Sequence, residues 1–277
     1  MLDEARKSIL AVHLSSGKRH FVSDAQTGGG TPFDSPHTIM SVKDSFAFVT
    51  DTNVGALLKV NVANGLRTEV TGPAVGSGPP LGKPRGFAMS KDGGTAWIVS
   101  GQPDAIFAVD LKSGARAIVS DPPTEVDVQF LLPESIAVSK DEATAWVSDA
   151  KHKRIVRVNL KTGERSPCSD EAHGEGPELL KPMSSALSSD ESKLYVVDMK
   201  ANSLLEVELA SGARRVLSSE SVGSGPRWRE ARTIALHPDG TRAFVSDGSA
   251  NTVSEYDGGD TLYAIDLLSG DRAVVSR

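Results

Sequence analysis

The sequence has very little cysteine, few aromatic residues and no long apolar run. Cys168 is the one cysteine of the 277 residues, so no disulfide can form within the chain. No apolar run approaches the ~20 residues of a transmembrane helix, and the chain does not open with the charged and then apolar stretch of a secretion signal. A net charge of −6 gives no generally basic surface, so we expect no binding to nucleic acid or to a membrane.

What the sequence does contain is a repeating unit of 49 residues, the spacing between Pro133 and Pro182. The unit that begins at Pro133 has four runs of strand length, at residues 134–139, 143–149, 154–160 and 164–169. Each run is rich in Val, Ile or Trp, or alternates apolar with polar residues, and turn residues follow it. Gly163 in the last turn supplies the positive φ that a tight hairpin favours. One unit is therefore predicted to be a four-stranded antiparallel meander.

The same positions recur in every unit. The units begin at Pro36, Pro84, Pro133, Pro182 and Ala231. Each second strand carries an aromatic residue at one place: Phe48, Trp97, Trp146, Tyr195 and Phe244. One such sheet cannot bury both of its faces, whereas sheets stacked radially cover each other, which is a β-propeller. A β-sandwich also has short strands at regular spacing, but it does not require every fourth strand to look alike.

We therefore expect an all-β fold, a six-bladed β-propeller that forms a single domain over residues 1–277. The repeats span about residues 1–35, 36–83, 84–132, 133–181, 182–230 and 231–277. The first ten residues align with residues 147–156, so the first sector supplies its outer two strands and lacks its inner hairpin. Either this sector is a half-blade, or residues upstream of Met1 have been lost. We favour a loss, because an open gap leaves strand edges unpaired. A lost leader leaves the localisation open.

Two of the recurring columns have a structural interpretation. The aromatic residues lie among apolar neighbours in mid-strand, so we expect them to fill the space between blades rather than to form a ligand-stacking platform. Most second strands end in an aspartate: Asp51, Asp149, Asp198 and Asp247, with Asp3 aligned to them. These carboxylates could form a metal ring, but their recurrence favours a repeated capping of backbone N–H groups.

The column after the repeat proline is the one that varies. It holds His37, Arg85, Glu134, Met183 and Arg232. If the first strand of each blade is innermost, these residues lie near the mouth of the central channel. Variation at a fixed position of a rigid scaffold is typical of a functional site, although solvated rim residues without a task would give the same pattern.

The pattern P-x-x-I-A-x-S-x-D at residues 133–141 resembles NHL-type repeats and the blades of the gluconolactonase (senescence-marker protein) family. The resemblance covers the whole chain and implies a propeller. In the lactonase family a Glu, an Asn and an Asp at the channel mouth hold a divalent metal. At the matching positions only Glu134 is a carboxylate, while Arg85, Met183 and Arg232 are poor ligands. We therefore expect no metal site of that kind and no other cofactor.

Seven residues are candidates for a site. Glu134, with His37 or His173, could act as an acid and base. Arg85, Arg232 and Arg227 could bind an anion, and Trp228 between arginines could stack on a ligand. Two alternatives stay open: Trp228 packs on its own blade, or Glu134 and Arg85 pair with each other and leave no charge for a ligand.

These candidates give two hypotheses for the function. The first is a small, anionic ligand at the channel mouth, with a hydrolase or lyase activity on a molecule such as a sugar acid. The second is a non-catalytic NHL-type scaffold that binds a peptide or protein loop at the same rim. A deep funnel with a perturbed Glu134 favours the first, and a shallow rim with an exposed Trp228 favours the second. We expect a monomer in either case.

Overall fold

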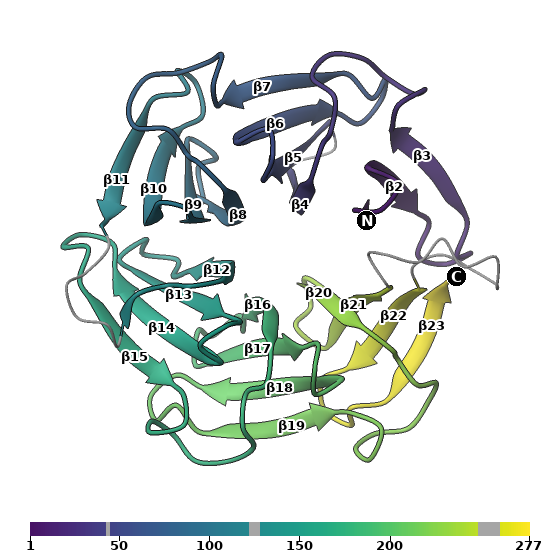
Figure 1. Ribbon diagram of the computed structural model, residues 1–277. Helices are drawn as coiled ribbons and strands as arrows, with labels where there is room; N and C mark the ends of the chain where they lie inside the picture. The colour runs from purple at the N-terminus through teal and green to yellow at the C-terminus, as the bar shows by residue number, and fades with distance from the viewer. Residues whose placement is uncertain (43–44, 122–127, 249–260) are drawn as a thin grey trace.

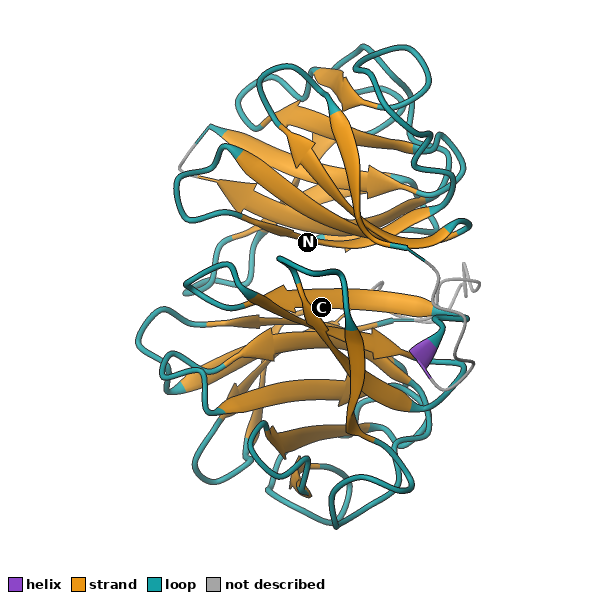
Figure 2. Cartoon of the chain, turned by 90° about the vertical axis from the view of Figure 1, so that its left-hand side faces the viewer, coloured by secondary structure: helices purple, strands orange, loops and turns teal. Residues whose placement is uncertain are grey.

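The computed structural model describes residues 1–42, 45–121, 128–248 and 261–277, and its strands form six antiparallel sheets. The sheets are arranged radially around a common centre, which confirms the six-bladed β-propeller (Figure 1). Figure 2 shows the same sheets from the side, with loops connecting the strands at both rims. No helix in the described residues is long and apolar enough to cross a membrane.

The fourth blade shows how one repeat folds. Its strands β12 (Pro133–Val138), β13 (Thr144–Asp149), β14 (Arg154–Asn159) and β15 (Arg165–Ser169) pair in sequence order. β12 is innermost and β15 is outermost (Figure 1). Gly163 in the turn before β15 has a φ of 77°, and a Cβ there would clash with the Val119 carbonyl oxygen. The turn therefore requires glycine because the neighbouring blade approaches it closely.

The other blades repeat this meander, with one exception. The second blade comprises β4 (Pro36–Val42), β5 (Phe46–Asp51), β6 (Ala56–Asn61) and β7 (Arg67–Thr71), and the third β8 (Pro84–Met89), β9 (Thr95–Gly101), β10 (Asp104–Asp110) and β11 (Arg116–Ser120). The fifth comprises β16 (Pro182–Leu187), β17 (Lys193–Asp198), β18 (Ser203–Glu208) and β19 (Arg214–Ser218), and the sixth β20 (Ala231–Leu236), β21 (Arg242–Asp247), β22 (Thr261–Asp266) and β23 (Arg272–Ser276). The first blade has three strands, β1 (Leu2–Asp3), β2 (Ser8–Val12) and β3 (Arg19–Ser23), and lacks the inner hairpin, as expected.

The core lies between neighbouring blades. Trp146 and Trp97 are 8% and 7% exposed, and Phe48 and Tyr195 are buried to the same degree, which confirms the structural interpretation of the aromatic column. Phe244 is only half-buried. Its face of the sixth blade looks toward the first blade, where no complete inner hairpin covers it.

The aspartate column caps backbone N–H groups, as the sequence predicted. Asp149 accepts hydrogen bonds from the backbone N–H groups of Leu131 and Leu132, which precede the blade, at 3.1 and 3.0 Å. Its side chain also accepts two hydrogen bonds from His152 in the loop that follows β13, one from the backbone N–H and one from the ring. Asp51, Asp198 and Asp247 bind the equivalent groups of their own blades. Each aspartate thus ties the chain that enters a blade to the end of its second strand.

A further set of contacts, which sequence reasoning missed, joins the outermost strands. The first residue of each such strand is an arginine, and its guanidinium donates to the hydroxyl that ends the outermost strand of the preceding blade. The six pairs are Arg67 with Ser23, Arg116 with Thr71, Arg165 with Ser120, Arg214 with Ser169, Arg272 with Ser218 and Arg19 with Ser276. Each hydroxyl donates in turn to a turn glycine carbonyl of the arginine's own blade, as Ser276 does to Gly17 at 2.6 Å. We call this set the outer clasp; Arg19 and Ser276 close the ring with it.

Candidate functional site

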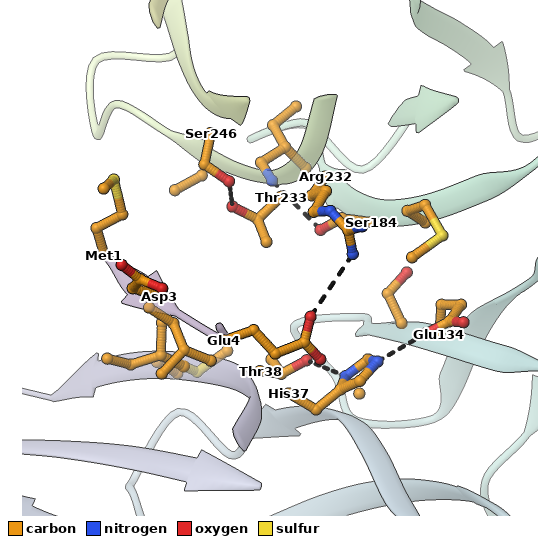
Figure 3. A pocket seen from close by; sticks show the side chains of 18 of the residues that line it. Met1, Asp3, Glu4, His37, Thr38, Glu134, Ser184, Arg232, Thr233 and Ser246 are labelled. Carbon is orange, nitrogen blue, oxygen red and sulfur yellow. Dashed lines mark hydrogen bonds and ion pairs between the residues drawn. The ribbon is translucent and has the colours of Figure 1, made fainter. Parts of the chain in front are cut away.

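A cavity of about 740 Å³ lies at the centre of the propeller. The five residues that follow the repeat starts, His37, Arg85, Glu134, Met183 and Arg232, all line it. Each is the second residue of an innermost strand. The segment Met1–Ala5 of the first blade lines the same cavity (Figure 3). The predicted column is therefore brought together at one place.

Glu134 is the centre of a buried charged cluster. Its side chain is 3% exposed, and its two oxygens lie 2.9 and 2.8 Å from Arg85 Nη1. His37 Nε2 lies 2.7 Å from Glu134 Oε2. Burial raises the pKa of the Glu134 carboxyl, but the hydrogen bonds from His37 and Arg85 and the positive charge of Arg85 outweigh burial and leave that pKa below its ordinary value. Glu134 is therefore a carboxylate at neutral pH.

This carboxylate fixes the proton on His37. An ionised Glu134 only accepts hydrogen bonds, so the 2.7 Å contact places a proton on His37 Nε2. Neutral imidazole then has its lone pair on Nδ1, which lies 3.1 Å from Thr38 Oγ1 and accepts a hydrogen bond from that hydroxyl. His37 is 14% exposed and lies on the wall of the cavity (Figure 3). The arrangement gives a base nitrogen held in one orientation by a buried carboxylate.

Arg232 is held much more loosely than Arg85. Its guanidinium nitrogens lie 3.6 Å from Glu4 Oε2 and 3.5 Å from Glu230 Oε2, and its Nε donates to the Gly248 carbonyl at 3.0 Å. The side chains of Arg232 and both glutamates are each between a quarter and a half exposed. Figure 3 shows Glu4 reaching across the cavity toward Arg232. The two arginines that the sequence predicted as equivalent anion ligands therefore differ in their surroundings.

The remaining three candidates do not line the cavity. His173 is about half exposed and its Nδ1 lies 2.8 Å from Asp170 in a loop at the outer side. Arg227 is exposed and pairs with Glu220. Trp228 is 5% exposed, packs edge-on against Tyr263 and lies 5.6 Å from the Arg272 guanidinium. The alternative in which Trp228 packs on its own blade is therefore confirmed.

Sequence reasoning missed two groups of cavity residues. Glu4 escaped notice because the first sector has no proline-led strand from which to count. The second group is a set of small hydroxyl residues two positions after the repeat starts: Thr38, Ser135, Ser184 and Thr233. Thr233 lies 2.6 Å from Ser246 Oγ, and Ser184 accepts a hydrogen bond from the Ile234 N–H. The recurrence of Ser or Thr at one place in four of the five innermost strands was the signal that could have found them.

Within residues 1–42, 45–121, 128–248 and 261–277, no three His, Cys, Asp or Glu side chains gather in a way that could hold a metal ion. The carboxylate at the channel mouth already has an arginine and a histidine as partners.

Solved structures share this fold across almost the whole chain. The propeller in a nidogen/laminin complex matches with a TM-score of 0.70 at 16% identity, over 98% of this chain and 90% of that one. A streptogramin B lyase matches with a TM-score of 0.63 at 14% identity, over 98% and 76% of the chains. A catalytically inactive virginiamycin B lyase from Staphylococcus aureus, in complex with quinupristin, matches with a TM-score of 0.62 at 14% identity, over 98% and 78%. No family model and no curated protein sequence matches the chain. The likeness establishes the propeller fold.

Proposed function

We propose that the channel mouth binds a small molecule with an anionic group and that His37 exchanges a proton with it. The observation that carries this proposal is the buried cluster of Glu134, His37 and Arg85 on the wall of a cavity of about 740 Å³. Pockets of roughly 300–1,000 Å³ with a few oriented polar groups are typical of small-molecule sites. The buried Glu134 with its lowered pKa and the buried Trp228 both favour this hypothesis over an interaction rim.

The two arginines have separate roles in the proposal. Arg85 makes short contacts to Glu134, so its charge is already satisfied and it positions the carboxylate. Arg232 has longer contacts to two partly exposed glutamates, so an anion that enters the cavity can displace Glu4 from it. The anchor for a carboxylate or phosphate is therefore Arg232.

His37 and Glu134 supply the chemistry. Hydrolysis and elimination both need a group that takes up a proton, and His37 Nδ1 carries the lone pair at the cavity wall. Glu134 orients the ring and stabilises the imidazolium that forms. Two further points support a hydrolase or lyase of this kind: the resemblance of the repeats to the gluconolactonase family, and a streptogramin B lyase among the structures with this fold. A sugar acid is the first ligand class to test.

The test is a thermal-shift screen of sugar acids and phosphorylated metabolites on the wild type and three variants. Arg232→Ala removes the anchor, His37→Gln removes the base, and Arg215→Ala is the control, since Arg215 pairs with Glu206 outside the cavity. A ligand at 100 times its Kd stabilises the folded state by roughly 2.7 kcal/mol. We expect the wild type, His37→Gln and Arg215→Ala to shift with at least one anion, and Arg232→Ala not to shift.

Turnover of the same ligand, followed by NMR, then tests the role of His37. Loss of turnover with retained binding in His37→Gln supports a base. If no compound shifts the wild type, the small-molecule site is wrong; if Arg232→Ala shifts like the wild type, the anchor is wrong.

A second candidate is a non-catalytic interaction with a peptide or protein loop at the rim. The fold neighbour from a nidogen/laminin complex supports it. An absence of shifts across the screen would leave this candidate as the better explanation of the channel mouth.

A further inference from the structure

The cavity at the channel mouth is lined by a third cationic residue, Lys181, in addition to Arg85 and Arg232. Lys181 is half-buried and stands directly before Pro182, the residue at which β16, the innermost strand of the fifth blade, begins. Because the innermost strands all begin at the same rim, Lys181 lies at the same end of the channel as Glu134, one blade further along the ring (Figure 1).

The backbone of Lys181 is fixed by the repeat. Its N–H group donates to the carboxylate of Asp198, with distances of 2.9 and 3.0 Å to the two oxygens, and its carbonyl oxygen accepts a hydrogen bond from the Met199 N–H at 3.0 Å. Neither contact uses an atom of the lysine side chain. A fixed backbone therefore places the side chain at the cavity, while its ammonium group is left for another partner.

The ammonium group of Lys181 has no carboxylate partner among the residues that the structure describes. Arg85, by contrast, pairs with Glu134 at 2.8 Å, and Arg232 pairs with two glutamates at 3.6 and 3.5 Å. A cation that loses part of its hydration without gaining a counter-ion is destabilised, and a bound anion removes this penalty. Lys181 thus offers a ligand a positive charge without the loss of an existing ion pair.

Lys83 shows that this placement is not a general property of the repeat. It stands directly before Pro84, as Lys181 stands before Pro182, but its side chain is exposed and does not line the cavity. An exposed lysine without an ion pair is ordinary, because water solvates its charge. The same residue type at the equivalent place of the fifth blade lines the cavity instead, and this difference indicates a binding role for Lys181.

We infer that the ligand of the channel mouth carries two anionic groups, one bound by Arg232 and the other by Lys181; this inference rests on the proposed function. The two cations belong to the fifth and sixth blades, which are neighbours in the ring, so the ligand spans them. Glu134 keeps Arg85 as its partner. The second group is a carboxylate or a phosphate, since a lysine ammonium binds either one as a point charge. A ligand with one anionic group leaves Lys181 unpaired and binds more weakly.

The test compares three sugar acids with the same carbon chain. Gluconate has one carboxylate, glucarate has a second carboxylate at the other end, and 6-phosphogluconate has a phosphate there. Their affinities for the wild type and two variants are measured by isothermal titration calorimetry. Lys181→Met removes the charge and keeps an unbranched side chain. Lys83→Met is the matched control, with the same change at the equivalent place outside the cavity.

We expect the wild type and Lys83→Met to bind glucarate or 6-phosphogluconate at least about 10-fold more tightly than gluconate, which is the effect of roughly one charge-assisted hydrogen bond. Lys181→Met should bind that ligand at least about 10-fold more weakly and gluconate no more than about 3-fold more weakly, so the preference disappears. Its melting temperature without ligand should equal that of the wild type, because no ion pair is lost. Whichever of the two ligands is preferred identifies the second group as carboxylate or phosphate.

Three results would overturn the inference. Equal affinities of the wild type for all three ligands, or a loss in Lys181→Met by the same factor for all three, would mean that Lys181 does not bind a second anionic group; the proposed small-molecule site would stand. No binding of any of the three to the wild type at about 10 mM would contradict the proposed function together with this inference.

Discussion

The outer clasp and the channel mouth are built from the same repeat, yet they differ in how closely the blades agree. Every blade interface has the same arginine, the same hydroxyl and the same glycine carbonyl, including the interface that closes the ring through Arg19 and Ser276. At the mouth no two neighbouring blades present the same residue in the column of Glu134. A contact needed for stacking recurs with the repeat, whereas a contact that serves a ligand occurs once.

Removing one arginine of the outer clasp should have the largest effect on stability. The Arg165 side chain is 1% exposed, lies 2.8 Å from Asp104 Oδ1, donates to Ser120 Oγ and stacks on Phe130. Arg165→Met leaves Asp104 without its cation, so we expect the free energy of unfolding to fall by about 3–5 kcal/mol. Urea denaturation followed by circular dichroism measures this.

The control for that variant is Arg157→Ala, on an exposed position of the same blade. Surface substitutions of this kind change stability by about 0.5 kcal/mol or less. Equal losses for Arg157→Ala and Arg165→Met would mean that the clasp adds nothing to the stability of the ring.

At the mouth, the corresponding test is Glu134→Gln, which keeps the shape of the side chain and removes its charge. Hydrogen bonds to charged groups contribute about 1.5–3 kcal/mol, so we expect a loss of about 2–3 kcal/mol at pH 7. The folded-state pKa of Glu134 lies below its ordinary value of 4.5, so its stabilisation is present above pH 4.5 and is lost as the pH falls through the folded-state pKa.

The difference between wild type and Glu134→Gln should therefore be constant from pH 7 to about 5 and shrink below the ordinary pKa of 4.5. Urea denaturation at a series of pH values measures it. A difference that stays constant down to pH 3 would show that the charge of Glu134 is not what Arg85 and His37 bind.

A smaller effect tests whether the interface between the first and sixth blades is as strong as the interfaces between the other blades. Ser169→Ala and Ser276→Ala each remove a hydroxyl that accepts from an arginine and donates to a glycine carbonyl. Each should cost about 1–2 kcal/mol, because buried partners lose a hydrogen bond. If Ser276→Ala costs nothing while Ser169→Ala costs the expected amount, the first and last blades are not joined in solution as tightly as the others.

Much of the fold could be predicted from the sequence, because the inner hairpin of the repeat occurs five times in the chain and the outer two strands occur six times. Pro133, Trp146, Asp149 and Gly163 each mark one place in a blade, and their recurrence predicted the strand order and the buried aromatic column. The sequence also contained the pattern that predicts the outer clasp, because an arginine stands two positions after each turn glycine, as Arg165 does after Gly163. That column was missed because a charged residue at the start of a strand is ordinarily expected to be exposed to solvent.

The site was predicted less completely, for physical reasons. Counting from the prolines found His37, Arg85, Glu134 and Arg232, since blade geometry carries them to one rim. Which residues pair with these charges depends on which loops meet in space. Glu4, a partner of Arg232, comes from the first sector, which has no repeat proline from which to count. Whether a loop residue such as Trp228 points outward or packs on Tyr263 depends on loop conformation, which periodicity does not determine.

The smallest effect on stability is expected for Arg232, which is held more loosely than Arg85 at the same channel mouth. Arg232→Ala removes two ion pairs of 3.5 and 3.6 Å whose members are all partly exposed. Pairs of this kind contribute about 0–1 kcal/mol, so the variant should unfold within about 1 kcal/mol of the wild type in urea. The same variant is expected to lose ligand-induced stabilisation. If its fold is as stable as that of the wild type, this loss can be attributed to lost ligand binding. A fall of about 3 kcal/mol or more without ligand would instead place Arg232 with Arg85 and Arg165, as a structural cation whose partners the fold requires.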